Sequence, residues 1–208
     1  MNALDHLSAA DPDLAALIAR IGPCTLEPAR REPYEALLRA IAHQQLHGRA
    51  AEAILGRLIA HHGGAFPLHD AVDATADEAL RACGFSAGKV RAIRDLCART
   101  RDGLVPTAAE AATLDDASLI ERLVAIRGVG RWTVEMLLIF TLGRPDVLPV
   151  DDFGVREGWR RIKGLDQQPR PKELAKLGEA WSPWRSTAAW YLWRAADEGK
   201  KVQNPLTS

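Results

Sequence analysis

Two glycines separated by one residue lie between two apolar stretches, with an arginine on each side. The segment reads Leu123-Val-Ala-Ile-Arg-Gly-Val-Gly-Arg-Trp-Thr-Val-Glu-Met136. Glycines at i and i+2 end a helix, so the pattern predicts a helix, a tight turn and a second helix. The turn would present backbone amides at a helix N-terminus, which bind anions such as a nucleic-acid phosphate. An ordinary helical hairpin with a glycine turn fits the same spacing.

A pair of carboxylates, Asp151 and Asp152, follows a loop that contains glycine and proline. A carboxylate beside a sugar can stabilise an oxocarbenium-like carbon and can orient or deprotonate a water molecule. Two adjacent aspartates at the start of a helix are also a common capping pattern. The residue types alone leave both interpretations open.

Two histidines, His43 and His47, have the i, i+4 spacing of zinc-binding residues on a helix. The segment between them lacks the glutamate of H-E-x-x-H, and the sequence signals no third ligand. The three cysteines show no C-x-x-C spacing, which argues against a thiolate metal site or a disulfide framework. We therefore expect no metal, and a zinc hydrolase is only a third alternative.

The composition is that of a soluble globular protein. The 208 residues include 27 basic and 27 acidic side chains, and no apolar run approaches the ~20 residues of a membrane span. No secretory signal precedes the first helix, so we expect a cytoplasmic protein without membrane contact. Residues 1–120 carry a net charge of −4 and residues 121–208 a net charge of +4, so the neutral total does not exclude a polyanionic ligand.

Apolar residues with helical spacing dominate the chain and predict an all-α fold. Asp11-Pro12 caps the first helical stripe, and Pro33 opens either one long helix or two successive helices up to His62. The best strand candidate, Val147–Val150, is short and contains a proline. Three further helix starts are predicted at a Thr75–Glu78 capping box, at Ser86 and at Asp116.

Four segments in order resemble the helix-hairpin-helix DNA glycosylase superfamily. Ile126–Thr133 is similar to its hairpin, and Leu142–Arg156 is similar to the Gly/Pro-rich loop and aspartate that follow. Ile41-Ala-His-Gln-Gln-Leu46 and Trp181–Trp193 are similar to segments of the 3-methyladenine DNA glycosylase II branch. The resemblance extends from about Pro12 to Asp197.

This resemblance implies a two-lobed all-α fold with the active-site cleft between the lobes. Residues 1–208 would form a single glycosylase core, with the hairpin at about 123–136 and the terminal helices in one lobe. Some members of the branch carry an additional N-terminal β-rich domain. We expect a core-only form here, because the chain has no room for that domain before Pro12.

The resemblance also implies roles for individual residues. Asp152 would be the catalytic carboxylate, and Asp151 an N-cap or a helper of local hydrogen bonding. Trp132 and Trp193 fall on positions that line the base pocket, and Met136 stands where an aromatic residue is frequent, which predicts a wider or less stacked pocket. The other tryptophans of the C-terminal region are expected in the core or between lobes: Trp181, Trp184 and Trp190.

Two further groups are expected to contact duplex DNA. The gap left by a flipped base would be filled from the Gln44-Gln45-Leu46 segment, with Gln45 as the first choice. The hairpin residues expected to hold the DNA backbone are Arg127, Gly128, Val129, Gly130, Arg131 and Thr133.

Two departures from the family pattern limit the reactions and cofactors that we expect. Members that also cut the DNA backbone place a lysine two residues after the second hairpin glycine, and Trp132 occupies that position. The iron-sulfur site of endonuclease III-like members requires four clustered cysteines, and no cysteine follows Cys97. We therefore expect neither lyase chemistry nor a cofactor, although the hairpin carbonyls could hold a monovalent cation.

The sequence thus predicts a monomeric, monofunctional DNA glycosylase of base excision repair. Its substrate would be double-stranded DNA with alkylated purines, whose positive charge weakens the bond to the sugar and favours contact with aromatic faces. The hydrolase would flip the base out, and Asp152 would assist the attack of water. The alternative is a non-catalytic helix-hairpin-helix protein that binds DNA or recognises damage.

Overall fold

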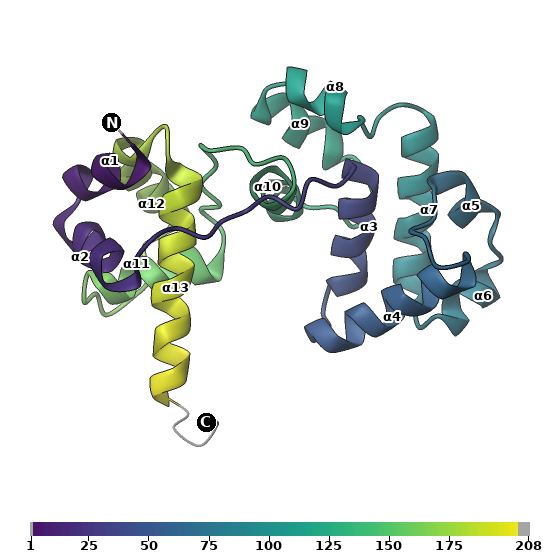
Figure 1. The fold of residues 1–208 in the computed structure, drawn as a ribbon, viewed down its shortest axis with the longest axis horizontal. Coiled ribbons are helices and arrows are strands. Elements are labelled where there is room, and N and C mark those ends of the chain that lie inside the picture. Colours follow the sequence, from purple (N-terminus) through teal and green to yellow (C-terminus); the bar gives the residue numbers. More distant parts are fainter. Residues whose placement is uncertain (1, 204–208) are drawn as a thin grey trace. The chain divides into compact units, whose positions relative to one another are not determined.

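The computed structural model describes residues 2–203, and every regular element in that range is a helix (Figure 1). The prediction of an all-α fold is confirmed. The strand candidate Val147–Val150 lies in the irregular chain that precedes a helix. Within the described range, no helix is both long enough and apolar enough to cross a membrane.

The described chain divides into two compact units. Residues 29–142 form the first, which we call the central unit. Residues 2–28 and 143–203 form the second, which we call the terminal unit because it contains both ends of the described chain. The glycine hairpin belongs to the central unit, and the Asp151–Asp152 pair belongs to the terminal unit.

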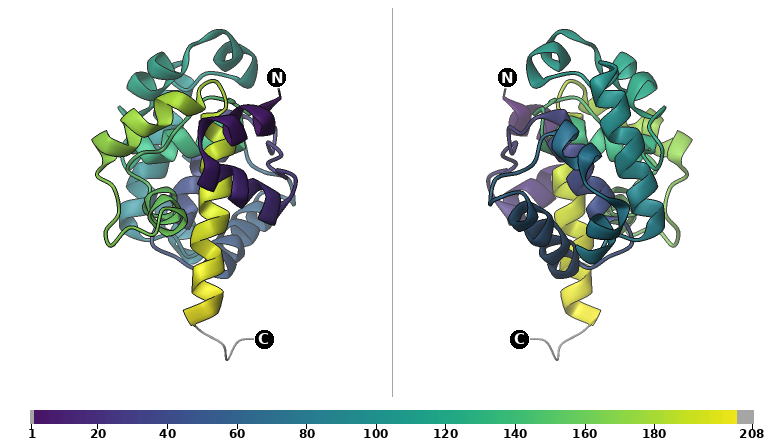
Figure 2. Two further views of the ribbon diagram at one scale, coloured as in Figure 1. Left: turned by 90° about the vertical axis from the view of Figure 1, so that its left-hand side faces the viewer. Right: turned by 90° about the vertical axis from the view of Figure 1, so that its right-hand side faces the viewer.

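The terminal unit is organised around its last helix, α13 (Arg185–Gln203), drawn in yellow in Figure 2. This helix packs mainly against α11 (Phe153–Ile162) and also against α2 (Pro12–Ile21). The side chains of Trp159, Trp181 and Tyr191 are buried in the core of the unit, and the ring centroids of the two tryptophans are 5.1 Å apart. Its helices are α1 (Ala3–Ala10), α2 (Pro12–Ile21), α11 (Phe153–Ile162), α12 (Pro171–Leu177), the 3-10 helix η1 (Gly178–Trp181) and α13 (Arg185–Gln203).

A glycine permits the close packing of α11 on α13. A Cβ atom at Gly158 would lie 2.0 Å from the carbonyl oxygen of Leu192, a distance that no side chain can occupy. The contact matters for the candidate site, because α11 begins directly after Asp152 and α13 carries Trp193.

The central unit is a bundle of helices. They are α3 (Pro33–His43), α4 (Gly48–His61), α5 (His69–Ala74), α6 (Asp77–Ala82), α7 (Ala87–Arg101), α8 (Ala108–Thr113), α9 (Asp116–Leu123) and α10 (Arg131–Phe140). Helix α7 packs against α3, α5 and α6, and the hairpin helix α10 packs against α3 and α9.

The helical pattern that opens at Pro33 is two helices, one of the two arrangements that the sequence left open. The chain leaves α3 after His43 and passes through Gln45, whose φ of 57° lies in the left-handed region. A residue in that conformation cannot continue a right-handed helix. The following helix α4 therefore starts afresh at Gly48.

Of the predicted helix starts, those at Asp11, Ser86 and Asp116 are confirmed, and the capping box at Thr75 is wrong. The side chains of Asp11 and Ser86 accept hydrogen bonds from the first amides of α2 and α7. Helix α9 starts at Asp116 as predicted, and Asp115 is its N-cap. The Thr75 capping box does not form, because the Thr75 hydroxyl donates instead to a carbonyl oxygen of α5, and α6 starts after Ala76 without a side-chain cap.

Candidate functional site

The glycine hairpin joins α9 to α10 in the central unit. Gly128 has a φ of 77°, in the left-handed region that favours glycine. Gly130 is the N-cap of α10, it provides no side-chain cap, and a Cβ atom there would meet nothing within 4 Å. The start of α10 is therefore open to an approaching group, which is the geometry of an anion site at a helix N-terminus.

The predicted DNA-contacting residues of the hairpin fall into two classes. Val129 and Thr133 have buried side chains, so only their backbones could reach a ligand. Arg131 is exposed, and its Nε atom donates to Glu135 at 2.9 Å. The backbone amide of Arg127 donates to Asp95 at 2.7 Å, which fixes the turn onto α7. The remaining exposed positions are Arg127, Gly128 and Gly130.

The turn between α3 and α4 is tied to this hairpin. The side-chain amide of Gln44 donates to the carbonyl oxygen of Gly128 at 2.8 Å. Gln45 and Leu46 are exposed at the tip of the turn, and Leu46 retains 41% of its accessible surface. The three residues predicted as the duplex plug thus differ in their surroundings. Gln44 is bonded to the hairpin, whereas Gln45 and Leu46 are exposed.

A cavity of about 750 Å³ opens beside the hairpin within the central unit. It lies between the end of α3, the start of α7 and the first turns of α10. Lys89 lies on its wall and donates to the carbonyl oxygen of Ala42 at 2.7 Å, and burial lowers the pKa of this lysine. Trp132 contributes an indole that is 49% exposed, and Met136 follows one turn later on α10.

A second cavity, of about 430 Å³, lies between α3 and α10. It extends over Leu137 and Phe140 of α10 and over Arg39 of α3. The two cavities share Ala40, His43, Thr133 and Met136. The predicted pocket residues Trp132 and Met136 are therefore next to each other on a hollow surface.

In the terminal unit, Asp152 is the N-cap of α11. Its Oδ1 atom accepts the backbone amide of Val155 at 2.8 Å and the indole Nε1 of Trp193 at 2.8 Å. The carboxylate is only partly buried. Two donors thus fix the direction of this carboxylate, as a catalytic group requires.

Glycine also leaves room for the indole of Trp193. A Cβ atom at Gly154 would lie 2.8 Å from Cδ1 of Trp193 and 3.2 Å from Oδ1 of Asp152. Trp193, predicted from the resemblance to line a base pocket, therefore has a positioning contact with the carboxylate in this structure.

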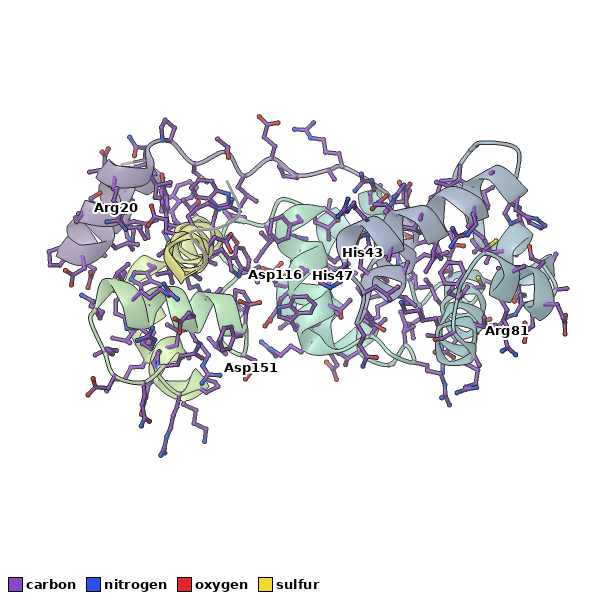
Figure 3. The ribbon with its side chains drawn as sticks, turned by 90° about the horizontal axis from the view of Figure 1, so that it is seen from below. Arg20, His43, His47, Arg81, Asp116 and Asp151 are labelled. Atoms are coloured by element: carbon purple, nitrogen blue, oxygen red, sulfur yellow. The ribbon has the colours of Figure 1, made fainter. Side chains whose placement is uncertain are left out.

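Of the two roles expected for Asp151, the N-cap of α11 is wrong, because Asp152 fills that position. Figure 3 labels Asp151. The chain turns through Pro149 and Asp151, and the amide of Asp152 donates to the carbonyl oxygen of Pro149 at 3.0 Å. This turn leaves the Asp151 side chain exposed. The second aspartate thus combines the cap with the place expected for catalysis.

The other C-terminal tryptophans belong to the core of the terminal unit. Trp181 and Trp190 are buried, and Trp184 is partly buried against the same cluster. The prediction that these tryptophans are core residues agrees with this packing.

The zinc alternative loses its geometric premise. His43 ends α3, and His47 is the N-cap of α4, so the two histidines are not on one helix (Figure 3). His43 Nε2 instead lies 2.9 Å from Oε1 of Glu52. Among the residues described, no three metal-ligating side chains gather into a group that could hold an ion.

Sequence reasoning missed Glu52 and Lys89, which both lie against the residues around the cavities. Each sits on an amphipathic helix among other charged residues, so its type and spacing resemble those of an ordinary solvated face. Only the return of α4 and α7 to the end of α3 brings them to His43 and Ala42.

Comparison with known proteins agrees with this geometry. A model of the HhH-GPD superfamily base excision DNA repair protein matches residues 38–183. The DNA-3-methyladenine glycosylase 1 of Schizosaccharomyces pombe is 43% identical over 206 residues, which cover 95% of this chain and 90% of that protein.

Two solved structures are similar over nearly the full chain. A complex of Schizosaccharomyces pombe 3-methyladenine DNA glycosylase with abasic DNA has a TM-score of 0.83 at 43% identity, and the match covers 93% of this chain and 96% of that one. The DNA-3-methyladenine glycosidase of Bacillus halodurans has a TM-score of 0.88 at 35% identity, with 97% and 92% covered.

Proposed function

Since this chain belongs to the HhH-GPD superfamily of base excision DNA repair proteins, we propose that it is a monofunctional DNA glycosylase. It hydrolyses the N-glycosidic bond of alkylated purines in double-stranded DNA, and it acts as a monomer. The observation that carries this proposal is the Asp152 carboxylate held by the amide of Val155 and the indole of Trp193.

Asp152 acts on the sugar. As the base departs, positive charge develops on the sugar, and a fixed carboxylate stabilises that charge better than a mobile one. The same carboxylate can orient water or remove its proton as the new C–O bond forms. The bond to Trp193 keeps the carboxylate in one direction without neutralising it, because an indole N–H carries no formal charge.

Trp132 and Met136 act on the base. The half-exposed indole of Trp132 offers a π-face to a cationic purine. Met136 is unbranched and polarizable, so it can adapt to bases of different shape. The hairpin binds the DNA backbone through its amides and through Arg127 and Arg131.

The turn between α3 and α4 fills the space of the flipped base. Of its three candidate residues, Gln44 is held by the hairpin carbonyl and Gln45 takes the left-handed conformation that makes the turn. Leu46 offers an exposed apolar side chain, the kind that inserts between base pairs. Leu46 therefore replaces Gln45 as our first choice.

Water is the nucleophile in this mechanism. Trp132 stands where a Schiff-base lysine would stand, and a tryptophan cannot form an imine. Lys163 is the alternative amine, and its Nζ atom is held by Asp11 at 2.5 Å and Asp13 at 2.6 Å, two residues near the start of the chain. Although burial lowers the pKa of Lys163, the bonds to these two carboxylates raise it above its usual value, which keeps the amine protonated.

The experiment is to incubate the protein with duplex DNA that contains one alkylated purine. We expect a free base and a full-length strand that breaks only after alkali, and we expect borohydride to trap no protein. Cleavage without alkali, or efficient trapping, would show lyase chemistry. Binding to the damaged duplex without base release would instead favour the non-catalytic alternative, which the hairpin alone would support.

A further inference from the structure

His43 is the last residue of α3 and lines both cavities of the central unit (Figure 3). It shares both linings with Thr133 and Met136 of α10, and Trp132 lies on the larger cavity. Its side chain is 39% exposed, so a ligand can reach the ring. The place of His43 is therefore the surface on which the proposed function puts the flipped base.

The contact with Glu52 determines which ring nitrogen can accept a hydrogen bond. A carboxylate only accepts hydrogen bonds, so His43 Nε2, 2.9 Å from Oε1 of Glu52, must carry the hydrogen. In a neutral imidazole the other nitrogen, Nδ1, is then an acceptor. Nδ1 of His43 makes no hydrogen bond to the residues that the structure describes, so it remains available.

Glu52 is itself held in place as the acceptor. It projects from the first turns of α4, and its second oxygen, Oε2, lies 3.9 Å from Nη1 of Arg39. Arg39 is in turn fixed by a bond of 2.8 Å to Glu35 on the same helix. The Arg39 guanidinium on one side and the imidazole N–H on the other hold the Glu52 carboxylate in place, which keeps the hydrogen of His43 on Nε2.

We propose that His43 is a specificity-determining residue that selects the purine at its 6-position. Resting on the glycosylase function proposed above, Nδ1 accepts a hydrogen bond from the exocyclic 6-amino group of an adenine-type base. A guanine-type base presents a 6-oxo group there, and two acceptors repel each other. The enzyme should thus release alkylated adenines in preference to guanines alkylated at the same ring nitrogen.

The test compares bases that share the alkylation site and differ in the purine. DNA treated with a methylating agent contains 3-methyladenine and 3-methylguanine, and 7-methyladenine and 7-methylguanine. Initial rates of release of each base, measured by chromatography with mass detection, give one adenine-to-guanine ratio for each ring nitrogen. We expect His43→Phe, which keeps an aromatic ring and removes the acceptor, to lower both ratios about tenfold.

A second variant tests the tautomer step. Gln at position 52 can donate or accept, so it no longer fixes the hydrogen on Nε2, and Glu52→Gln should lower both ratios by a smaller factor than His43→Phe. Glu121→Gln, an exposed change on α9, serves as the matched control and should leave the ratios unchanged. Thermal melts verify that each variant is folded.

The outcomes separate this inference from the function on which it rests. If the unmodified protein releases no base from methylated DNA, the glycosylase proposal fails. If it releases bases and His43→Phe leaves both ratios unchanged, the role of His43 is wrong and the glycosylase stands. A ratio that falls in His43→Phe but not in Glu52→Gln would overturn the control of the tautomer by Glu52.

Discussion

At the scale of single residues, Asp152 combines a structural role with the proposed catalytic one. Asp152→Asn removes the negative charge, and because asparagine is also a good N-cap, α11 should keep its start. We expect the single-turnover rate of base release to fall about 1000-fold with little change in DNA affinity. Asp151→Asn is the matched control and should cost less than threefold, since Asp151 is exposed and caps nothing. Comparable losses in both variants would contradict the assignment of Asp152.

Trp193 offers a second test at the same scale. Trp193→Phe keeps an aromatic ring and removes the indole N–H that donates to Asp152. The carboxylate would then be held by the Val155 amide alone and should sample more directions, so we expect the single-turnover rate to fall about tenfold while the affinity for abasic DNA is unchanged. A loss that appears only in DNA affinity would mean that Trp193 binds the substrate and does not position the carboxylate.

The sequence predicted the residue types of the site better than their contacts. It selected Asp152 through the family motif, yet it offered the cap of α11 as one of two roles for Asp151, because both aspartates precede the helix and only the turn after Pro149 decides between them. The bond from Trp193 joins positions 41 residues apart, which no local pattern reveals.

At the scale of elements, the start of α10 provides a test in which stability and binding should move in opposite directions. Gly130→Asp introduces an N-cap side chain with open space around it, so the melting temperature should stay the same or rise. The new carboxylate would occupy the helix amides and repel a phosphate. We expect the affinity for duplex DNA to fall at least about tenfold, as measured in a salt series. An unchanged affinity would exclude the hairpin as the site that binds the DNA backbone.

The contact between α11 and α13 gives a packing test. At Gly158 a Cβ atom would collide with the carbonyl oxygen of Leu192, so Gly158→Ala should lower the free energy of unfolding by about 3 kcal/mol. The control is Gly56→Ala in α4, where a Cβ atom meets nothing within 4 Å and alanine should stabilise the helix by about 0.5–1 kcal/mol. Denaturant titration measures both. Equal effects would show that the two helices can separate without cost.

Helix periodicity was enough to find most elements and not enough to divide one of them. Apolar residues with helical spacing occur on both sides of the turn at Gln44–His47, so the break there depends on the left-handed Gln45 and on the bond from Gln44 to the hairpin. That bond comes from a segment 84 residues away. Local propensity is weaker than such tertiary contacts.

At the scale of the whole molecule, the chain builds the terminal unit from its first 28 and its last residues, and builds the central unit between them. The helical periodicity of apolar residues could not predict this division. Each apolar stripe indicates only that a helix buries one face, and it does not indicate which other helix covers that face. The expectation that the helices at both ends of the chain lie in one lobe came from the family resemblance. Its motifs are far apart in the sequence, so their order indicates which distant segments belong together.

The stability of the terminal unit should depend on pH through Glu157 of α11. Hydrogen bonds from Arg160, together with Gln168 and Arg161, hold the pKa of Glu157 at about 2, although burial opposes this shift. The shortest of these contacts, between Arg161 Nε and Oε1, is 2.7 Å. A carboxylate whose pKa is lowered on folding stabilises the protein above its unfolded pKa and loses that contribution as the pH falls.

We therefore expect the free energy of unfolding to decrease by about 2 kcal/mol from this group between about pH 5 and pH 2. Glu157→Gln should be less stable than the unmodified protein at pH 7, because a neutral amide cannot pair with two guanidinium groups. The difference between the two proteins should shrink across the same interval, since protonation of Glu157 makes the unmodified protein resemble the variant. Denaturant titrations at half-unit pH steps measure this difference. A constant difference from pH 7 to pH 2 would mean that packing, and not the charge of Glu157, stabilises this part of α11.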